Sequence, residues 1–146
     1  MSCIHDLVRN QDTYRADVEQ TVLAVAQAMV ERNIGAVPVM RDGFLAGVFS
    51  ERDLMRRVVV EGLDPAKTKV GDVMTSDPLT VQPNADLETC KFLMRRHGFR
   101  HLPVCDGQQL HGMVSMRDII LHDLSEKDDE VRMMLAYIHS TPQPGL

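Results

Sequence analysis

Two short motifs, each a serine followed three residues later by an aspartate, have the residue types and spacing for ligand chemistry. They are Ser50 with Asp53 and Ser115 with Asp118. A carboxylate has two acceptor oxygens, so each aspartate can accept hydrogen bonds from both hydroxyls of a ribose, and the charge strengthens such bonds. A serine at the start of a helix lies beside free backbone N–H groups, which favour a phosphate. Residues of these types could therefore bind a ligand that carries a ribose and a phosphate.

The same spacing is also typical of a helix capping box, in which the serine and the carboxylate satisfy backbone donors at the helix end. Taken singly, each motif favours capping. The two roles are compatible, because a capping serine can still donate to a ligand. The arginine before each aspartate, Arg52 or Arg117, could reach a phosphate or pair with a carboxylate, and the sequence leaves both roles open.

Each motif ends a longer segment that occurs twice in the chain. Gly47–Asp53 returns as Gly112–Asp118, an offset of 65 residues, and residues 37–39 return at the same offset as 102–104. A repeat of this length indicates one supersecondary unit used twice. Because a core of about 65 residues would be marginal alone, we expect the two copies to share one core.

The repeated unit is predicted to run helix, strand, turn, strand and helix, which gives a mixed α/β (α+β) fold. Apolar residues recur at helical spacing before Asn33 and before Gly98, residues that tolerate the left-handed conformation at a helix end. Asp42-Gly43 and Asp106-Gly107 predict hairpin turns. The predicted strands span residues 36–40, 44–49, 101–105 and 110–114, with short strands near 14–18 and 79–83.

The repeat divides the chain into a first module (1–62), a linker (63–78), a second module (79–124) and a C-terminal helix with a frayed tail (125–146). We expect the last helix to begin at a capping box formed by Ser125 and Asp128. Its apolar face could bury against a twin chain or another protein. This supports an alternative function, a structural dimerisation or interaction module without nucleotide binding. The face consists of Val131, Met134, Leu135 and Ile138.

Composition excludes several classes of protein. The net charge of −5, with scattered Lys and Arg, argues against binding to nucleic acid or to an acidic membrane. No apolar stretch is long enough to span a bilayer and the N-terminus has no signal-peptide pattern, so we expect a soluble cytoplasmic protein. Cys3, Cys90 and Cys105 cannot all pair and fit free thiols. Cys105, at a strand end, is the candidate for reactivity.

We expect neither an enzyme nor a metal site. The chain shows no nucleophile–base pair and no phosphate-binding glycine loop. His97 and His101 have metal-like spacing, but Gly98 between them is expected to end the helix that would align them.

The ordered set of helix, strand, Val-Pro-Val, strand, serine–aspartate motif and helix, present twice in tandem, resembles the cystathionine-β-synthase (CBS) domain pair. The segment 70–81 is similar to the lead-in of many such modules. The resemblance covers roughly residues 4–124 and implies a small stand-alone CBS domain-containing protein (Bateman module). It implies two tandem β-α-β-β-α modules packed by pseudo-twofold symmetry. Together with the repeat, it favours a ligand role for at least one motif.

In this family the clefts between modules bind adenosine-containing ligands. The resemblance therefore implies AMP, ADP or ATP as a regulatory ligand, with S-adenosylmethionine or NAD as further possibilities, and no required cofactor. It also implies that each cleft combines the motif of one module with the strand before the proline of the other. A homodimer, and a change in the angle between modules passed to an unknown effector protein, complete the expectation.

The residues implied at the first cleft are Ser50, Arg52, Asp53, Thr80, Phe99, Arg100, His101 and Leu102, and those at the second are Ser115, Arg117, Asp118, Arg15, Ile34, Gly35, Ala36 and Val37. The repeat aligns Arg100 with Gly35 and His101 with Ala36. We therefore predict that the Asp53 cleft binds the charged nucleotide more tightly. Adenine is expected in an apolar slot beside Val37 or Leu102.

Overall fold

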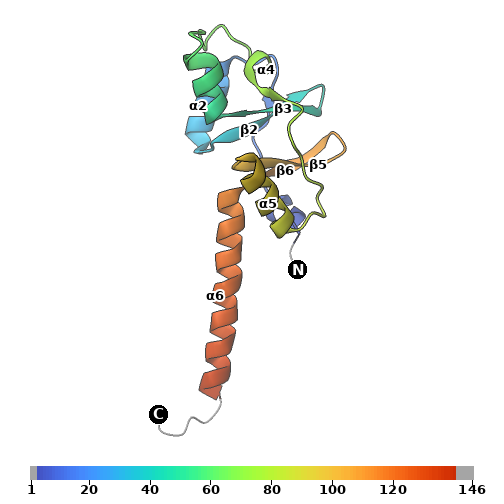
Figure 1. The fold of residues 1–146 in the computed structure, drawn as a ribbon, viewed down its shortest axis with the longest axis vertical. Helices are drawn as coiled ribbons and strands as arrows, with labels where there is room; N and C mark the ends of the chain where they lie inside the picture. The colour runs from blue at the N-terminus through green and yellow to red at the C-terminus, as the bar shows by residue number, and fades with distance from the viewer. Residues whose placement is uncertain (1–2, 141–146) are drawn as a thin grey trace.

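Two similar α/β units lie against each other, and one long helix projects from the second unit (Figure 1). The structure is a computed structural model that describes residues 3–140, and the tail predicted for residues 140–146 lies outside this range except for its first residue. Among the described residues, no helix combines the length and apolar character needed to span a bilayer.

The first unit is built on a four-stranded sheet in the order β1-β2-β3-β4. The strand β1 runs parallel to β2, and the other neighbours are antiparallel. A short α-helix that begins after Ser50 continues as a π-helix. The elements are β1 (Ala16–Asp17), α2 (Val22–Arg32), β2 (Ala36–Arg41), β3 (Phe44–Ser50), α3 (Glu51–Asp53), η1 (Leu54–Val59), α4 (Val70–Val73) and β4 (Thr75–Ser76).

The second unit repeats this plan around the two-stranded sheet β5-β6. Its β-bridge between Val81 and Val104 corresponds to the pairing of Ala16 with Val39 in the first unit, so the repeat extends to the strand pairing. The elements are α1 (His5–Val8), α5 (Leu87–His97), β5 (His101–Asp106), β6 (Gln109–Ser115) and α6 (Met116–Ser140).

The predicted helix ends and the first hairpin turn are confirmed. Asn33 and Gly98 adopt the left-handed conformation at the ends of α2 and α5, with φ of 54° and 70°. Asp42 and Gly43 form the turn between β2 and β3 with positive φ. The second turn differs from the prediction, because Asp106 is the last residue of β5 and Gly107-Gln108 makes the turn. Only Gly107 has positive φ there, as a type II′ turn requires.

The long helix α6 corrects the predicted helix boundary at Ser125. The helix is continuous from Met116 to Ser140. No Gly or Pro lies in this range, so nothing in the sequence forces an end, and serine costs little in a helix interior. The corresponding helical segment of the first unit stops near Gly62, which has a φ of 70°.

Each unit has its own buried core, so the prediction that the two copies share one core is wrong; each core is completed by a segment from outside its own repeat. Ile4 and Val8, before the first repeat, pack into the core of the second unit. Val70 and Val73, after the first repeat, pack into the core of the first unit. The division at residues 62 and 78 stays a prediction, but the cores draw on residues from both sides of it.

A third, small cluster joins the two units. Met40 and Leu45 come from the first hairpin, and Cys105 and Leu110 are their repeat equivalents in the second. The backbone N–H of Leu45 donates to the carbonyl of Gln108 at 3.1 Å. Equivalent residues thus meet at the join, as pseudo-twofold packing requires.

Burial in this cluster overturns the prediction that Cys105 is the reactive thiol. The Cys105 side chain is buried, and burial raises its pKa. A strand end in the sequence did not reveal that the partner hairpin covers it.

The glycine that opens each repeated motif has a steric role. A Cβ on Gly47 would lie 2.5 Å from the backbone oxygen of Thr75, and a Cβ on Gly112 would lie 2.9 Å from the Val8 side chain. The glycines let β4 and the N-terminal segment lie directly on strands β3 and β6.

Candidate functional site

Both serine–aspartate motifs form the predicted capping boxes. The carboxylate of Asp53 accepts from the backbone N–H of Ser50 at 3.0 Å, and the Ser50 hydroxyl accepts from the N–H of Asp53 at 3.2 Å. The corresponding distances for Ser115 and Asp118 are 3.1 Å and 3.0 Å. Capping leaves open whether either carboxylate has an oxygen available to a ligand.

Asp53 has both oxygens engaged within the protein. Its Oδ2 also accepts from the Ser50 hydroxyl at 3.1 Å, and its Oδ1 accepts from the Thr75 hydroxyl at 3.2 Å. The guanidinium of Arg57 lies 3.6 Å from Oδ1. Asp53 is buried with 9% exposure. A ligand at this position would have to replace existing partners.

Asp118 differs from Asp53 in both burial and partners. It is exposed, and Oδ2 is the oxygen that accepts from Ser115. Within the described residues, no hydrogen bond or ion pair engages its Oδ1. The Ser115 hydroxyl accepts from the Asp118 N–H but donates to no described acceptor. Asp118 therefore presents one free carboxylate oxygen and Ser115 one free hydroxyl proton.

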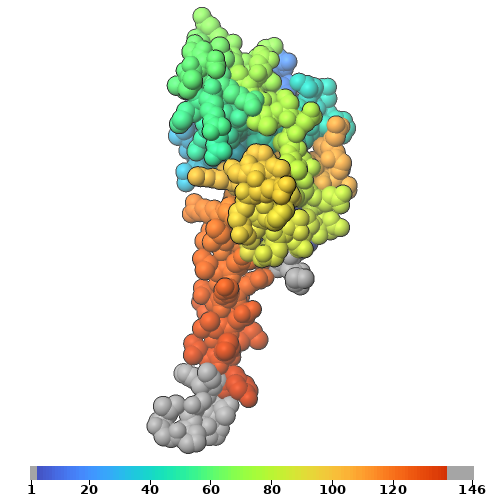
Figure 2. Space-filling model, in the orientation of Figure 1, coloured from blue at the N-terminus to red at the C-terminus, as the bar shows by residue number. Residues whose placement is uncertain are grey.

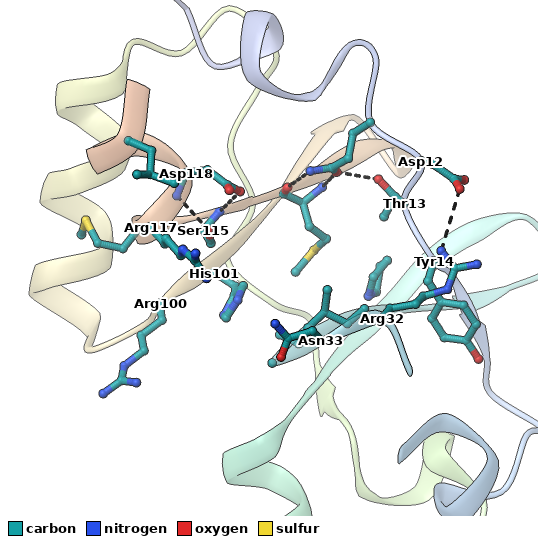
Figure 3. A pocket seen from close by; sticks show the side chains of 18 residues that line it. Asp12, Thr13, Tyr14, Arg32, Asn33, Arg100, His101, Ser115, Arg117 and Asp118 are labelled. Carbon is teal, nitrogen blue, oxygen red and sulfur yellow. Dashed lines mark hydrogen bonds and ion pairs between the residues drawn. The ribbon is translucent and has the colours of Figure 1, made fainter. Parts of the chain in front are cut away.

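Ser115 and Asp118 line a cleft of about 920 Å³ between the two units. A cleft of this size is large enough for a nucleotide. Figure 3 shows side chains of the first unit, including Arg32 and Asn33, opposite Ser115 and Asp118 of the second. The lining from the first unit and its N-terminal lead includes Gln11, Asp12, Thr13, Tyr14, Arg32, Asn33, Ile34, Gly35, Ala36 and Pro38. The lining from the second includes Arg100, His101, Met113, Ser115, Met116, Arg117, Asp118 and Leu121.

The charged groups around the cleft favour an anion. Arg32, Arg100 and Arg117 line it together with only two carboxylates, Asp12 and Asp118. Arg32 lies 3.9 Å from Asp12, and its guanidinium lies 5.2 Å from the centroid of the Tyr14 ring. Both partners are near the surface, so this ion pair is weak and leaves Arg32 adaptable.

The imidazole of His101 has a lowered pKa in this cleft. Burial lowers the pKa of His101, and the nearby carboxylates of Asp118 and Glu51 oppose that effect only in part. His101 is therefore neutral at neutral pH and can donate or accept a hydrogen bond.

The structure corrects the predicted partners of the two motifs. Arg100 and His101 were expected against Asp53, but both line the Asp118 cleft. The cause is the strand pairing, because His101 lies opposite Ser115 in the β5–β6 ladder. The reasoning that gave the Asp53 cleft the cations is therefore wrong. Arg52 instead reaches the other unit, where it donates to the carbonyl of Gly98 at 3.4 Å.

The predicted base slot is also corrected in part. Gly35 and Ala36 line the Asp118 cleft as expected, but Val37 and Leu102 are fully buried in the two cores. Successive residues of a strand point to opposite faces, so Ala36 and Pro38 face the cleft while Val37 faces the core. The apolar wall is formed by Ile34, Ala36, Pro38, Met113, Met116 and Leu121.

Two other predicted residues lie outside this cleft. Arg15 donates to the carbonyl of Leu110 at 3.1 Å, which holds it on the second hairpin. Thr80 is exposed, and the threonine that contacts Asp53 is Thr75.

Sequence reasoning missed the residues of the N-terminal lead and of the end of α2. Gln11 forms two hydrogen bonds with the backbone of Met113, at 2.9 and 3.0 Å, and so fixes this segment along β6. Tyr14 and Arg32 follow on the cleft wall. Arg57, four residues after Asp53, had a helical spacing that could have revealed its contact. The other contacts had no comparable signal.

The predicted interruption between His97 and His101 is confirmed, since Gly98 ends α5. His97 stacks on Phe99 at 5.6 Å between ring centroids, away from His101 in the cleft lining. Over residues 3–137, no group of three or more His, Cys, Asp or Glu side chains is placed to hold a metal ion.

Comparison with known proteins gives consistent matches. The sequence profile of the CBS domain matches residues 6–60 and 70–125. The CBS domain-containing protein CBSX3, mitochondrial, of Arabidopsis thaliana is 34% identical over 125 residues, which cover 82% of this chain and 61% of that protein. This chain thus spans less than two thirds of the plant relative. The CBS domain-containing protein YhcV of Bacillus subtilis is 32% identical over 127 residues, covering 87% of this chain and 89% of YhcV.

The solved structures include close matches to the fold. The crystal structure of CBSX2 in complex with AMP aligns with a TM-score of 0.75 at 26% identity, covering 87% of this chain and 99% of that chain. The match agrees with two tandem α+β units of the kind described above.

Proposed function

Because the chain belongs to the CBS domain family, with two copies of the domain in tandem, we propose that it is a non-catalytic regulatory module that binds an adenine nucleotide. The proposed site is the cleft at Asp118. One observation carries this choice, namely that Asp118, whose Oδ1 has no partner among the described residues, lines a cleft with arginines from both units. The AMP complex of CBSX2, a protein of similar fold, supports the ligand class.

The residues of the cleft have distinct proposed roles. Asp118 accepts from the ribose hydroxyls, and Ser115 donates to the ligand at the start of α6. Arg100, Arg117 and His101 bind the phosphate. The apolar surface of Gly35 and Ala36 lies against the base. AMP is the first ligand to test, followed by ADP, ATP, S-adenosylmethionine and NAD.

Asp53 is proposed to have a structural role first. Its Oδ1 is bonded to Thr75 and lies near Arg57, and a ribose would have to displace these groups. We therefore expect one tighter site, at Asp118. If Ser50, Arg52 and Asp53 bind a second ligand, they do so more weakly.

The regulatory output would act through the packing of the two units. A ligand that contacts both cleft walls favours the arrangement in which the walls fit it, and it can shift only an equilibrium for which it has such differential affinity. We propose that a homodimer in the cytoplasm passes this change to an effector protein.

Isothermal titration calorimetry with AMP tests the site. Asp118→Asn keeps an oxygen that can cap Ser115 but removes the charge, so we expect a loss of about 1.5–3 kcal/mol, or about 10- to 150-fold in Kd. The matched control is Asp53→Asn, which should change the Kd of the tighter site by less than about threefold.

Equal losses in the two variants would contradict the assignment to Asp118. If the wild-type chain binds none of the five adenosine compounds at millimolar concentration, the alternative of an interaction module without a nucleotide is favoured.

A further inference from the structure

The helix α6 projects from the second unit, with no other described segment against its far part in the view of Figure 2, and it carries a row of exposed apolar residues. Leu124, Val131 and Leu135 are about half exposed, at 53%, 53% and 49%. With Leu121 and Asp128 they are spaced alternately by three and four residues. This is the spacing of the seam of a coiled coil, with Asp128 as its one polar position. We call the positions 121, 124, 128, 131 and 135 the α6 seam.

The charges beside the α6 seam are ordered. Lys127 flanks one side and Arg132 the other, while Asp129 and Glu130 lie on the outer face of the helix. Asp128 and Arg132 are exposed, and in the described part of the chain neither takes part in an ion pair. Charges at such positions decide which partner helix fits and in which direction.

We propose that the α6 seam pairs with the same seam of a second copy of this chain, in antiparallel orientation. A parallel pair would set Asp128 directly against Asp128 of the second copy and would bring Lys127 beside Arg132 of that copy. Both contacts join like charges, so the parallel orientation is disfavoured.

The antiparallel orientation gives Asp128 and Arg132 partners of opposite charge. In an antiparallel pair the residue numbers of two facing residues always have the same sum. A register that pairs Leu124 with Leu135 of the second copy therefore also pairs Asp128 with Val131 of that copy. In that register Asp128 lies beside Arg132 of the second copy, across the seam. Twofold symmetry makes each contact occur twice. The seam is self-complementary in shape and charge.

The seam covers only about two heptads, so we expect a reversible dimer whose population rises with concentration. This inference names a surface for the homodimer of the proposed function, but it does not depend on the ligand. The seam substitutions below lie outside the lining of the Asp118 cleft, so AMP binding is a separate readout.

Sedimentation equilibrium of the full chain tests the proposal. We expect the wild type to dimerise, and Asp128→Arg and Arg132→Asp each to weaken the dimer at least about tenfold because like charges then meet. An equimolar mixture of these two variants should form the heterodimer, since every cross-seam pair is again opposite in charge. The matched control is Asp129→Arg on the outer face, which should leave the dimer constant unchanged.

The double variant Asp128→Arg with Arg132→Asp decides the orientation. It restores both cross-seam pairs of an antiparallel dimer, whereas in a parallel dimer the two side chains at position 128 still carry like charges and repel each other. We therefore expect a dimer of wild-type strength. Circular dichroism checks that α6 is retained in every variant.

Several outcomes would overturn the inference. A wild type that stays monomeric at the highest soluble concentration shows that a second copy does not cover the seam. A dimer unaffected by Asp128→Arg shows that another surface forms it. A monomeric double variant refutes the antiparallel orientation. Unchanged AMP affinity in all variants would leave the proposed nucleotide site intact in each case.

Discussion

Replacing Asp53 by alanine should destabilise the fold much more than the same change at its repeat equivalent, Asp118. The two residues share one motif and one capping geometry, so the comparison isolates what surrounds them. Asp53 is buried and accepts from Ser50 and Thr75. Asp118 is exposed and accepts only from Ser115 among the described residues.

The magnitude follows from the bonds that are lost. Loss of a capping side chain costs about 1 kcal/mol in either unit. Asp53→Ala also leaves the Thr75 hydroxyl without its acceptor in a partly buried position, which adds about 1–3 kcal/mol. The ion pair with Arg57 adds little, because Arg57 is half exposed. We expect about 2–4 kcal/mol for Asp53→Ala and about 1 kcal/mol for Asp118→Ala.

Thermal unfolding without ligand measures the difference. At roughly 2–4 °C per kcal/mol for a chain of this size, Asp53→Ala should lower Tm by about 5–15 °C, and Asp118→Ala by about 2–4 °C. Thr75→Val serves as a control, since it removes the hydroxyl and should reproduce part of the Asp53 effect. Equal shifts for the two aspartates, or a larger shift for Asp118, would refute the structural assignment of Asp53.

Two further predictions concern titratable groups. Because burial lowers the pKa of His101 from 6.5, the unfolded chain gains a proton first as the pH falls, so the stability contributed by neutral His101 is complete above pH 6.5 and is lost toward lower pH. Melting curves from pH 7.5 to 5 should show His101→Gln losing less stability than wild type, and parallel pH profiles would contradict this. Burial raises the pKa of Cys90 to about 11 and also raises the pKa of Cys105. Iodoacetamide should therefore label Cys3 in the native protein and the other two cysteines only after denaturation, as peptide mass spectrometry would show. Rapid labelling of Cys105 in the native protein would show that the hairpin cluster opens.

Local chemistry made much of the fold predictable from the sequence. Asn33 and Gly98 end their helices because they tolerate the left-handed conformation, and Asp42-Gly43 turns a hairpin for the same reason. The length of α6 was missed because Ser125 has a capping pattern, yet the preceding residues carry nothing that ends a helix. A capping pattern marks a possible helix start. A helix begins there only if the preceding residues are not already helical.

The candidate site was predictable only where it depends on the repeat and on the family resemblance. The repeat identified Asp118, the resemblance to the CBS domain pair implied Gly35 opposite it, and both residues line one cleft. Neither the repeat nor the resemblance could show that the Thr75 hydroxyl donates to the carboxylate of Asp53, or that Arg32 lines the cleft of Asp118. These contacts join segments far apart in the chain, and their partners differ between the two copies. Two equal motifs therefore acquired unequal surroundings.

The exchange of segments between the two cores has a mechanical consequence. Residues 9–15 connect α1, which is packed in the second unit, to β1 of the first, and this connection includes Gln11, Thr13 and Tyr14 of the cleft wall. This part of the cleft wall is thus a chain segment whose two ends are held in different units. Because Gln11 is bonded to Met113 of the second unit and the chain continues from there into β1 of the first, residues 12–15 must absorb any change in the spacing of the two units. Cleaving the backbone within residues 9–15 should remove this connection between the two units.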